Sequence, residues 1–402
     1  MNSYQVVCLV CLSGAIAFSP PRFSLLQMAV AQNQPTNPLE VEIDRQDRLI
    51  PLGYGRRELS AFEIRRIEQE IAKLDRSAKA ELARGNGKEA FKLWYRQLKL
   101  ARAVNTVTEI ETLGKVGAIA WQENRGEDLR NIANRLITIE SKIETDELAA
   151  ETGQKLATAY QQVRYLEQAI AIYEQILAEN EQQKNSQAVA ENWETLGKLY
   201  MAQFNYPSAA SSYEKLLELA QTKPDLNLQT SFYLKTLADI YDRNGQTSQA
   251  LAAKKRLYNN HEATNKTAQL AELKLAIAED YQASKQTSSA IEAYNQAFEL
   301  ASENQQLAIA SNALTGLAEL HQQAGEREQA IATFERLLEL QRQAYNYYGL
   351  VNTYDTLGKI HLASAQPQQA KQYFQQALAI AKDLNYRVEY FARKIQQSDR
   401  DN

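Results

Sequence analysis

A repeat of about forty residues constrains the fold more than any other feature of this sequence. Six times along the chain, Leu or Ile is followed directly by Gly or Ala, and Tyr or His stands three positions later. An alanine stands thirteen residues after each Leu or Ile. These alanines are Ala169, Ala209, Ala250, Ala290, Ala330 and Ala370, at spacings of 40, 41, 40, 40 and 40. Alanine makes up about a seventh of the chain, so chance would give six in succession about once in a hundred thousand. The chain is therefore built from repeated units.

One unit predicts two short amphipathic helices joined by a turn. Gly197 and Tyr200 share one face of the first helix, and Ala209 and Tyr213 share one face of the second. Pro207 suits the first turn of the second helix, because its missing N–H is not needed there. Small residues such as Gly197 and Ala209 let two helices approach closely. A single pair cannot bury its apolar face, so the pairs are expected to stack on one another.

The repeats predict an all-α solenoid. Four residues after each repeated alanine comes an aromatic residue, and Lys254 is the one departure. Two weaker copies precede the six, which predicts about eight antiparallel helix pairs over residues 59–382. Val388, Phe391 and Ile395 then predict a capping helix, followed by a polar tail, within residues 383–402. Only 15 Gly and 8 Pro in 402 residues disfavour an all-β fold.

These residues resemble the tetratricopeptide repeat family. The similarity lies in the small residue after Leu, the aromatic three further on, and the later Ala and aromatic of the second helix; Trp193 also occupies the family's Trp position. The closing proline of the family is missing, and the period is 40 rather than 34, so each helix or connection must be longer. The resemblance implies a right-handed superhelix that binds protein or peptide ligands.

The N-terminal residues predict export. Residues 6–18 form a 13-residue apolar run, and Ala29 and Ala31 complete an A-x-A cleavage pattern, so residues 1–31 are expected to be a signal peptide. An uncleaved anchor is the alternative, because the first five residues carry no Lys or Arg. The expected location is the periplasm, or a thylakoid lumen or membrane periphery, with membrane contact only through a partner. Residues 32–58 are polar and predict a linker or arm.

Composition excludes several classes of function. A net charge of −4 without a long basic run argues against nucleic acid as a partner. Both cysteines lie in the first dozen residues, so a cleaved chain has none, and three His remain. Without cysteines and with only three histidines, the chain has too few of the residues that form a catalytic triad or a zinc site. It also has no glycine-rich phosphate loop. His321 and His361 lie one repeat apart and could share a metal, but packing imidazoles fit the repeat better. We expect a protein without catalysis or cofactor.

The expected binding surface lies on the first helix of each pair, which we call the A helix; the second is the B helix. In a stacked array, A helices line the concave groove, and the side chains directed away from the B helices are free to meet a ligand. These candidate partner-binding residues are Lys198, Met201, Phe232, Lys235, Asp239, Asp242, Glu279, Glu319, Lys359 and Leu362. Acidic residues in the middle and lysines on either side favour a peptide with basic groups. A solvated charged face is the alternative.

Two further interpretations are open at this point. The carboxylates Asp239, Asp242, Glu279 and Glu319 could bind or deliver a divalent cation such as Mn²⁺ or Ca²⁺ through oxygen ligands. A cluster of tyrosines lies at the start of the last repeat and could form either a hot spot for binding a partner or a packing layer between repeats. Its members are Tyr345, Tyr347, Tyr348 and Tyr354.

In size and general character the exported chain also resembles cyanobacterial periplasmic processing-associated repeat factors. That resemblance rests on architecture and carries no diagnostic motif. It implies a role as an assembly factor for a membrane complex such as photosystem II, with a subunit precursor and manganese as ligands.

Overall fold

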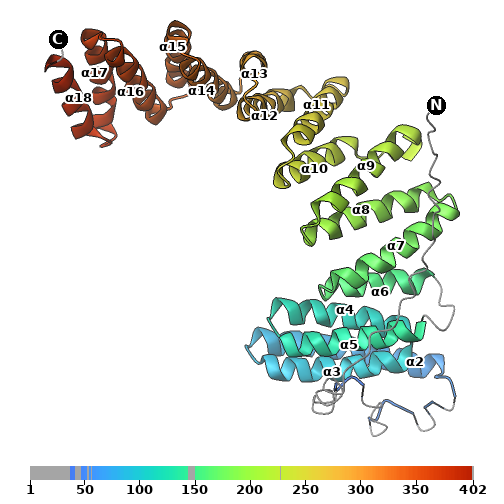
Figure 1. The fold of residues 1–402 in the computed structure, drawn as a ribbon. Helices are drawn as coiled ribbons and strands as arrows, with labels where there is room; N and C mark the ends of the chain where they lie inside the picture. The colour runs from blue at the N-terminus through green and yellow to red at the C-terminus, as the bar shows by residue number, and fades with distance from the viewer. Residues whose placement is uncertain are drawn as a thin grey trace, which may run out of the picture. The chain divides into compact units, whose positions relative to one another are not determined.

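The computed structural model describes residues 37–40, 47–51, 54, 55, 57–143, 150–226 and 228–400. Within these ranges it contains 17 α-helices and no β-strand, which confirms the predicted all-α repeat solenoid (Figure 1). The expected signal peptide, residues 1–31, lies outside the described residues. The chain forms two compact units, residues 1–164 and 165–402.

The first unit consists of helices α2 to α6. Each of these helices packs against the helix that precedes or follows it, and α4 also packs against α6. The helices are α2 (Ala61–Ala83), α3 (Gly87–Val104), α4 (Thr106–Gln122), α5 (Gly126–Ile143) and α6 (Ala150–Gln162). The repeat that contains Leu156 and Ala169 falls across the boundary, so its A helix belongs to this unit and its B helix to the next.

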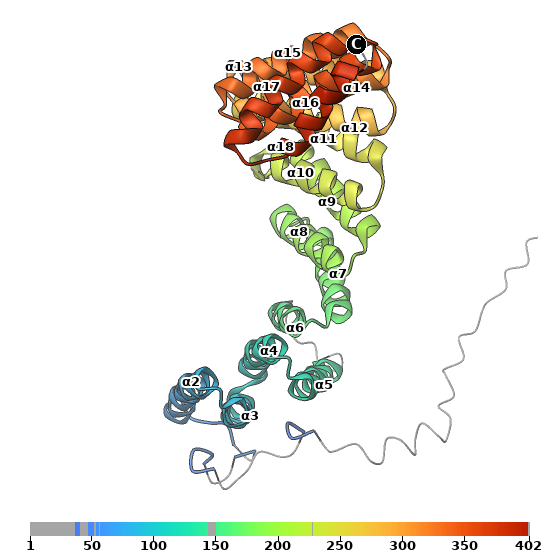
Figure 2. The same ribbon diagram turned by 90° about the vertical axis from the view of Figure 1, so that its left-hand side faces the viewer.

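The second unit stacks helices α7 to α18 in chain order (Figures 1 and 2). Its A helices are α8 (Ser186–Ala202), α10 (Thr230–Arg243), α12 (Leu270–Ala283), α14 (Leu307–Gln323) and α16 (Tyr347–Ala363). Its B helices are α7 (Leu166–Gln182), α9 (Tyr206–Thr222), α11 (Thr247–Ala263), α13 (Thr287–Glu303), α15 (Arg327–Gln343) and α17 (Pro367–Asp383). Short 3₁₀ turns, η1 (Pro224–Leu226) and η2 (Thr267–Gln269), precede α10 and α12, and α18 (Val388–Arg400) closes the stack.

Helix length explains the forty-residue period. From α13 to α17 every helix has 17 residues and every connection has three. Each connection contains one residue with left-handed backbone geometry, which reverses the chain direction at the helix end. Gly245 and Gly325 fill this position in two A–B turns, whereas Phe204 adopts φ 59° in the turn between α8 and α9. The next helix begins at Tyr206 with Pro207 in its first turn, as the sequence predicts.

The small and aromatic residues of the repeat form the packing between helices. Tyr213 is 2% exposed, and its ring would lie 2.8 Å from a Cβ atom added to Gly197. Phe374 is fully buried, and its ring would lie 2.5 Å from a Cβ atom added to Gly358. A side chain at Gly197 or Gly358 would therefore clash with the aromatic ring that faces it, because protein interiors are close-packed. The repeated residues build the core.

The first helix begins with a capping box, and the last helix covers the end of the array as the sequence predicts. Ser60 and Glu63 form a capping box: the backbone N–H of Glu63 donates to Ser60 Oγ at 3.3 Å, and that of Ser60 donates to Glu63 Oε2 at 2.8 Å. At the other end, Phe391 of α18 is fully buried against the last helix pair. Helix α18 extends to Arg400, and Ser398, which we expected in the polar tail, is 1% exposed.

The described part of the arm before α2 packs against the first unit. Leu39 and Ile50 are 4% and 6% exposed. The Asn37 side-chain amide donates to the backbone carbonyl of Asn131 at 2.7 Å, and Arg102 donates to the Leu39 carbonyl at 3.2 Å. These contacts join residues far apart in sequence, so this segment is a docked part of the unit.

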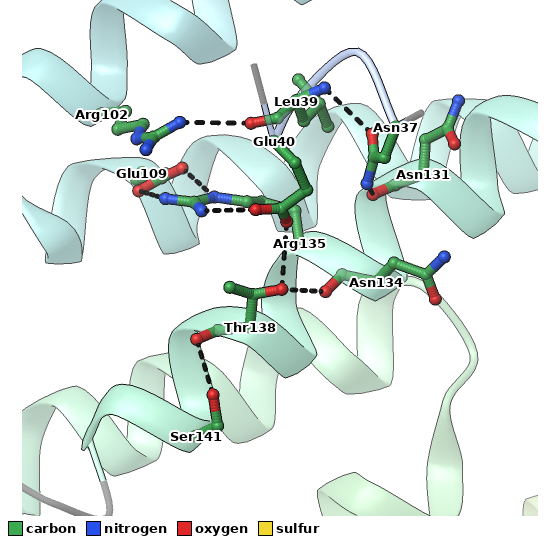
Figure 3. A network of polar contacts seen from close by, with 10 residues as sticks. All are labelled: Asn37, Leu39, Glu40, Arg102, Glu109, Asn131, Asn134, Arg135, Thr138 and Ser141. Atoms are coloured by element: carbon green, nitrogen blue, oxygen red, sulfur yellow. Dashed lines mark hydrogen bonds and ion pairs between the residues drawn. The ribbon is translucent and has the colours of Figure 1, made fainter. Parts of the chain in front are cut away.

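A buried ion pair anchors the arm (Figure 3). Arg135 of α5 is 4% exposed and donates from Nε to Glu109 of α4 at 2.7 Å. Its Nη1 donates to the Glu40 carboxylate of the arm at 3.2 Å, and Thr138 Oγ1 donates to the same carboxylate at 3.0 Å. A bidentate Arg–carboxylate pair is a strong and directional contact. Glu40 thus joins a pair that α4 and α5 already form.

Candidate functional site

Five candidate residues occupy equivalent positions on five consecutive A helices of the second unit. Each lies two residues before the aromatic or His of its helix, which turns it about 200° away from that packed side chain. All five side chains are exposed. They are Lys198 on α8, Asp239 on α10, Glu279 on α12, Glu319 on α14 and Lys359 on α16, and we call them the A-helix line.

The lysine at the start of the A-helix line is held by an acid one turn earlier. Lys198 Nζ lies 2.5 Å from Glu194 Oε1. Tyr233 of the next A helix donates to the other oxygen of Glu194 at 3.2 Å. The Glu194 carboxylate therefore links α8 to α10, and Lys198 is partly neutralised.

The lysine at the other end joins the capping helix. Lys359 Nζ lies 2.9 Å from Asp355, which is 3% exposed. Arg387 and Tyr390 also donate to Asp355, each at 2.9 Å. Lys359 therefore belongs to a network that fastens α18 to α16.

The middle of the line is acidic and unpaired. Within residues 228–400, Asp239, Glu279 and Glu319 form no ion pair or hydrogen bond with another side chain. Partial desolvation and the adjacent Asp280 carboxylate raise the pKa of Glu279. Burial, together with Glu279 and Glu319, raises the pKa of Tyr294 to about 12. Three unpaired carboxylates on successive A helices create a negative potential that attracts cationic ligands.

The other candidate residues differ in how far packing uses them. Phe232 is 44% exposed, with its ring 5.9 Å from that of Tyr233, and Lys235 on the same helix is exposed. Met201 and Leu362 are half-buried and pack against the cores of their repeats. The structure therefore leaves Phe232 and Lys235 available to a ligand, whereas Met201 and Leu362 mainly support the fold.

Asp242 belongs to a charged cluster around Lys254. Lys254 Nζ lies 3.0 Å from Asp242 and 2.8 Å from Asp280 of the next A helix. The side chains of Lys254 and Asp280 are 13% and 14% exposed. Burial alone would lower the pKa of Lys254, but its bonds to Asp280 and Asp242 outweigh burial and raise it. Burial also raises the pKa of Asp280, against the effect of Lys254.

The repeat pattern singles out Lys254 but does not reveal its partner. Asp280 stands directly before Tyr281, where the equivalent residues of the neighbouring A helices are buried and aliphatic. Those residues are Leu199, Ile240, Leu320 and Ile360. The aromatic–aliphatic contact of the other repeats is thus replaced by a buried ion pair. Aligning the repeats at the position before the aromatic would have revealed it.

His321 and His361 form local bonds. His321 Nδ1 lies 2.5 Å from Glu326, and His361 Nδ1 lies 2.7 Å from Gln366, each within its own repeat turn. The described residues contain no group of three or more His, Cys, Asp or Glu side chains arranged to hold a metal ion. No helix in the described ranges is long and apolar enough to span a bilayer.

The tyrosines at the start of α16 divide between surface and core. Tyr345, Tyr347 and Tyr348 are 76%, 49% and 55% exposed. Tyr354 is 5% exposed and accepts a hydrogen bond from Arg342 at 2.7 Å. Tyr354 therefore serves inter-repeat packing, and only the first three tyrosines are exposed at the surface.

Antiparallel helix pairs that stack through a repeated small-residue and aromatic code define an all-α helical-repeat protein. Models of the tetratricopeptide repeat match residues 309–383 and 190–223. Two stretches of the second unit therefore match tetratricopeptide repeats. None of the curated proteins matches the sequence.

Several solved structures are similar to this chain. BtubC (BKLC) from P. vanneervenii is 21% identical, with 55% of this chain and 92% of that chain covered and a TM-score of 0.37. The apo form of RapI is 12% identical, with 83% and 97% covered and a TM-score of 0.39. The MamA protein is 17% identical, with 50% and 94% covered and a TM-score of 0.35.

Proposed function

We propose that this protein is a non-catalytic scaffold that binds a protein or peptide segment bearing basic side chains along the A-helix line. Asp239, Glu279 and Glu319 meet the basic groups, and Phe232 receives an apolar side chain beside them. The observation that carries the proposal is the set of three exposed, unpaired carboxylates, one on each of α10, α12 and α14. Their spacing of one per repeat suits an extended ligand that crosses several A helices.

The test is a comparison of two charge-matched triple variants. Peptides captured from an unbiased display library by the full chain are labelled, and their affinities are measured by fluorescence anisotropy. We expect basic peptides to be enriched, and Asp239→Asn with Glu279→Gln and Glu319→Gln to weaken their binding by about tenfold or more.

The control variant removes three exposed carboxylates from B helices, by Glu299→Gln, Glu303→Gln and Glu328→Gln. It changes the net charge equally, so it should leave affinity nearly unchanged at moderate salt. Equal weakening by both variants would reduce the effect to net charge, and enrichment of acidic or uncharged peptides would refute the proposed ligand.

We further propose that the scaffold is exported and acts on a membrane complex. The apolar run of residues 6–18 and the Ala29–Ala31 pattern support export, and the resemblance to periplasmic processing-associated factors supports assembly of a complex such as photosystem II. N-terminal sequencing of the native protein tests cleavage after Ala31. Co-precipitation with newly made subunits of the membrane complex tests the role, and an intact N-terminus in the cytosolic fraction would contradict export.

A further inference from the structure

A cleft between α11, α12 and α13 has a composition that the packing code of the repeats does not explain. It encloses about 370 Å³, and Ile277 and Ala293 lie among the residues that line it. Its polar lining consists of two lysines, two tyrosines and four other polar side chains, namely Lys255, Lys274, Tyr258, Tyr281, Asn259, Ser289, Glu292 and Gln296. The cleft is distinct from the A-helix line, which is acidic at this point.

Lys274 replaces a core residue. It stands three residues before Ile277, and the equivalent positions of the other A helices in the second unit carry Trp193, Leu234, Leu314 and Tyr354. Leu234 and Leu314 are 3% and 1% exposed. A lysine at a position built for a buried apolar side chain opens the cleft, and it costs stability unless the charge is used.

Lys255 reverses a negative charge that three other repeats carry at the same position. It occupies the B-helix position where Glu174, Glu214 and Glu335 stand in those repeats, and the remaining two repeats have uncharged amides there. The Tyr200 hydroxyl donates to Glu174 at 2.5 Å, and the Tyr241 hydroxyl donates to Glu214 at 3.5 Å. With Lys255, the next tyrosine in this series loses its carboxylate acceptor.

Four hydrogen-bond donors of the cleft consequently lack acceptors. Lys274 Nζ lies 3.9 Å above the Tyr258 ring, and Lys255 Nζ lies 4.8 Å above the Tyr281 ring. Within residues 228–400, neither lysine has an ion pair, and neither tyrosine hydroxyl has a hydrogen bond. Glu292, which also lines the cleft, accepts a bond from Gln296 at 3.2 Å. Among the described residues, the cleft therefore holds two ammonium groups without an ion pair and two hydroxyl groups without a hydrogen bond.

We propose that this cleft binds a phosphate-type oxyanion, in which the phosphate oxygens accept bonds from Lys255, Lys274 and the two tyrosine hydroxyls. A dianion matches two ammonium groups, and its several oxygens match the number of donors. Burial lowers the pKa of Lys274, an effect that the Glu262 and Glu292 carboxylates oppose and that the Lys255 charge adds to. The net shift is downward, so a bound anion relieves an existing electrostatic cost. The phosphate is either free in solution or part of a phosphorylated partner.

The test measures binding of inorganic phosphate to the full chain by calorimetry and by NMR of the lysine ammonium groups, with chloride at equal ionic strength as the reference. We expect saturable phosphate binding that Lys274→Leu weakens by about tenfold or more. Leucine is the residue of two equivalent positions, so this variant should fold, and circular dichroism checks it. Lys255→Glu should abolish binding, and Glu292→Gln should tighten it because it removes a nearby negative charge.

The matched control is Lys382→Leu, which removes an exposed lysine of α17 without an ion pair in the described region. It should leave phosphate binding unchanged. Absence of saturable binding, or equal loss in Lys274→Leu and Lys382→Leu, would overturn the proposal. A phosphoserine peptide that binds more tightly than inorganic phosphate, with its unphosphorylated form inactive, identifies a phosphorylated partner as the source. Equal affinities identify free phosphate. Neither result depends on the basic ligand proposed for the A-helix line.

Discussion

Exchanging the buried pair Lys254–Asp280 for the residues of the neighbouring repeats tests how the array tolerates charge in its core. Lys254 and Asp280 lie 2.8 Å apart. In the repeats on either side, the equivalent pairs are apolar: Tyr213 and Ile240 share one core cluster, and Tyr294 and Leu320 share another. The relevant variants are therefore Lys254→Tyr, Asp280→Leu and the double replacement.

Each single change leaves one charge without its main partner. Removing one member of a fully buried ion pair costs about 3–5 kcal/mol. Here the two side chains retain 13% and 14% exposure, and Lys254 keeps Asp242 at 3.0 Å. We therefore expect Asp280→Leu and Lys254→Tyr each to lower the free energy of unfolding by about 2–3 kcal/mol.

The double variant restores the aromatic–aliphatic contact. Well-packed apolar replacements of buried ion pairs are neutral or stabilise by about 1–4 kcal/mol, so the double variant should be at least as stable as the parent chain. The coupling energy between the two positions should then be about 4 kcal/mol or more.

The assay is urea unfolding of the full chain, followed by circular dichroism. Amide hydrogen exchange serves as a local reading, because repeat arrays need not unfold in one step. Destabilisation should appear as faster exchange in α11 to α13. A double variant whose loss equals the sum of the two single losses would refute the reasoning, since additive losses mean that the two positions do not interact.

Three further predictions concern the helix packing and the turns. Gly358→Ala places a methyl group against the Phe374 ring and should cost about 1–3 kcal/mol in urea unfolding, whereas Gly126→Ala, which meets open space, should be neutral. The pKa of Glu63 is lowered from 4.5 to about 2, first by the side-chain hydrogen bond from Arg57 and then by the bonds from Ser60 in the capping box. Its stabilising effect is therefore complete above pH 4.5 and is lost as the pH falls through about 2. Glu63→Gln should flatten that acid dependence, and an unchanged curve would contradict it. Phe204→Gly should raise the unfolding midpoint slightly, because glycine relieves the left-handed backbone by about 1 kcal/mol more than it adds in chain entropy; a lower midpoint would show that Phe204 packs in solution.

Much of the fold could be predicted because the same packing requirement recurs in every repeat. A small residue that must face an aromatic ring, as Gly358 faces Phe374, recurs every forty residues and fixes both helices. The A-helix line could be predicted as exposed for the same reason, since helical geometry places it opposite the packed face. The ligand of the A-helix line could not be predicted in this way, because helical packing determines which side chains are exposed and not what they bind.

Contacts between repeats were harder to predict. The partner of Lys254 lies 26 residues away on the next A helix. It becomes visible only when the repeats are aligned, because Asp280 is then the one charged residue at a position that is otherwise aliphatic. Docking of the arm could not be predicted, because the segment has no periodicity and its contact from Asn37 to Asn131 spans 94 residues. Local patterns determine helices, but they do not determine where an irregular segment rests.

The way in which the arm is anchored has a consequence for local opening. Arg135 bonds to Glu109 through Nε and Nη2, at 2.7 and 3.1 Å, independently of Glu40. When the arm leaves, the buried guanidinium keeps a bidentate partner, and the Glu40 carboxylate passes into water. Undocking therefore strands no charge in the core, and its main cost is the exposure of Leu39 and Ile50. Because such an opening requires far less free energy than unfolding of the helices, amides of the arm should exchange with solvent long before those of α4 and α5.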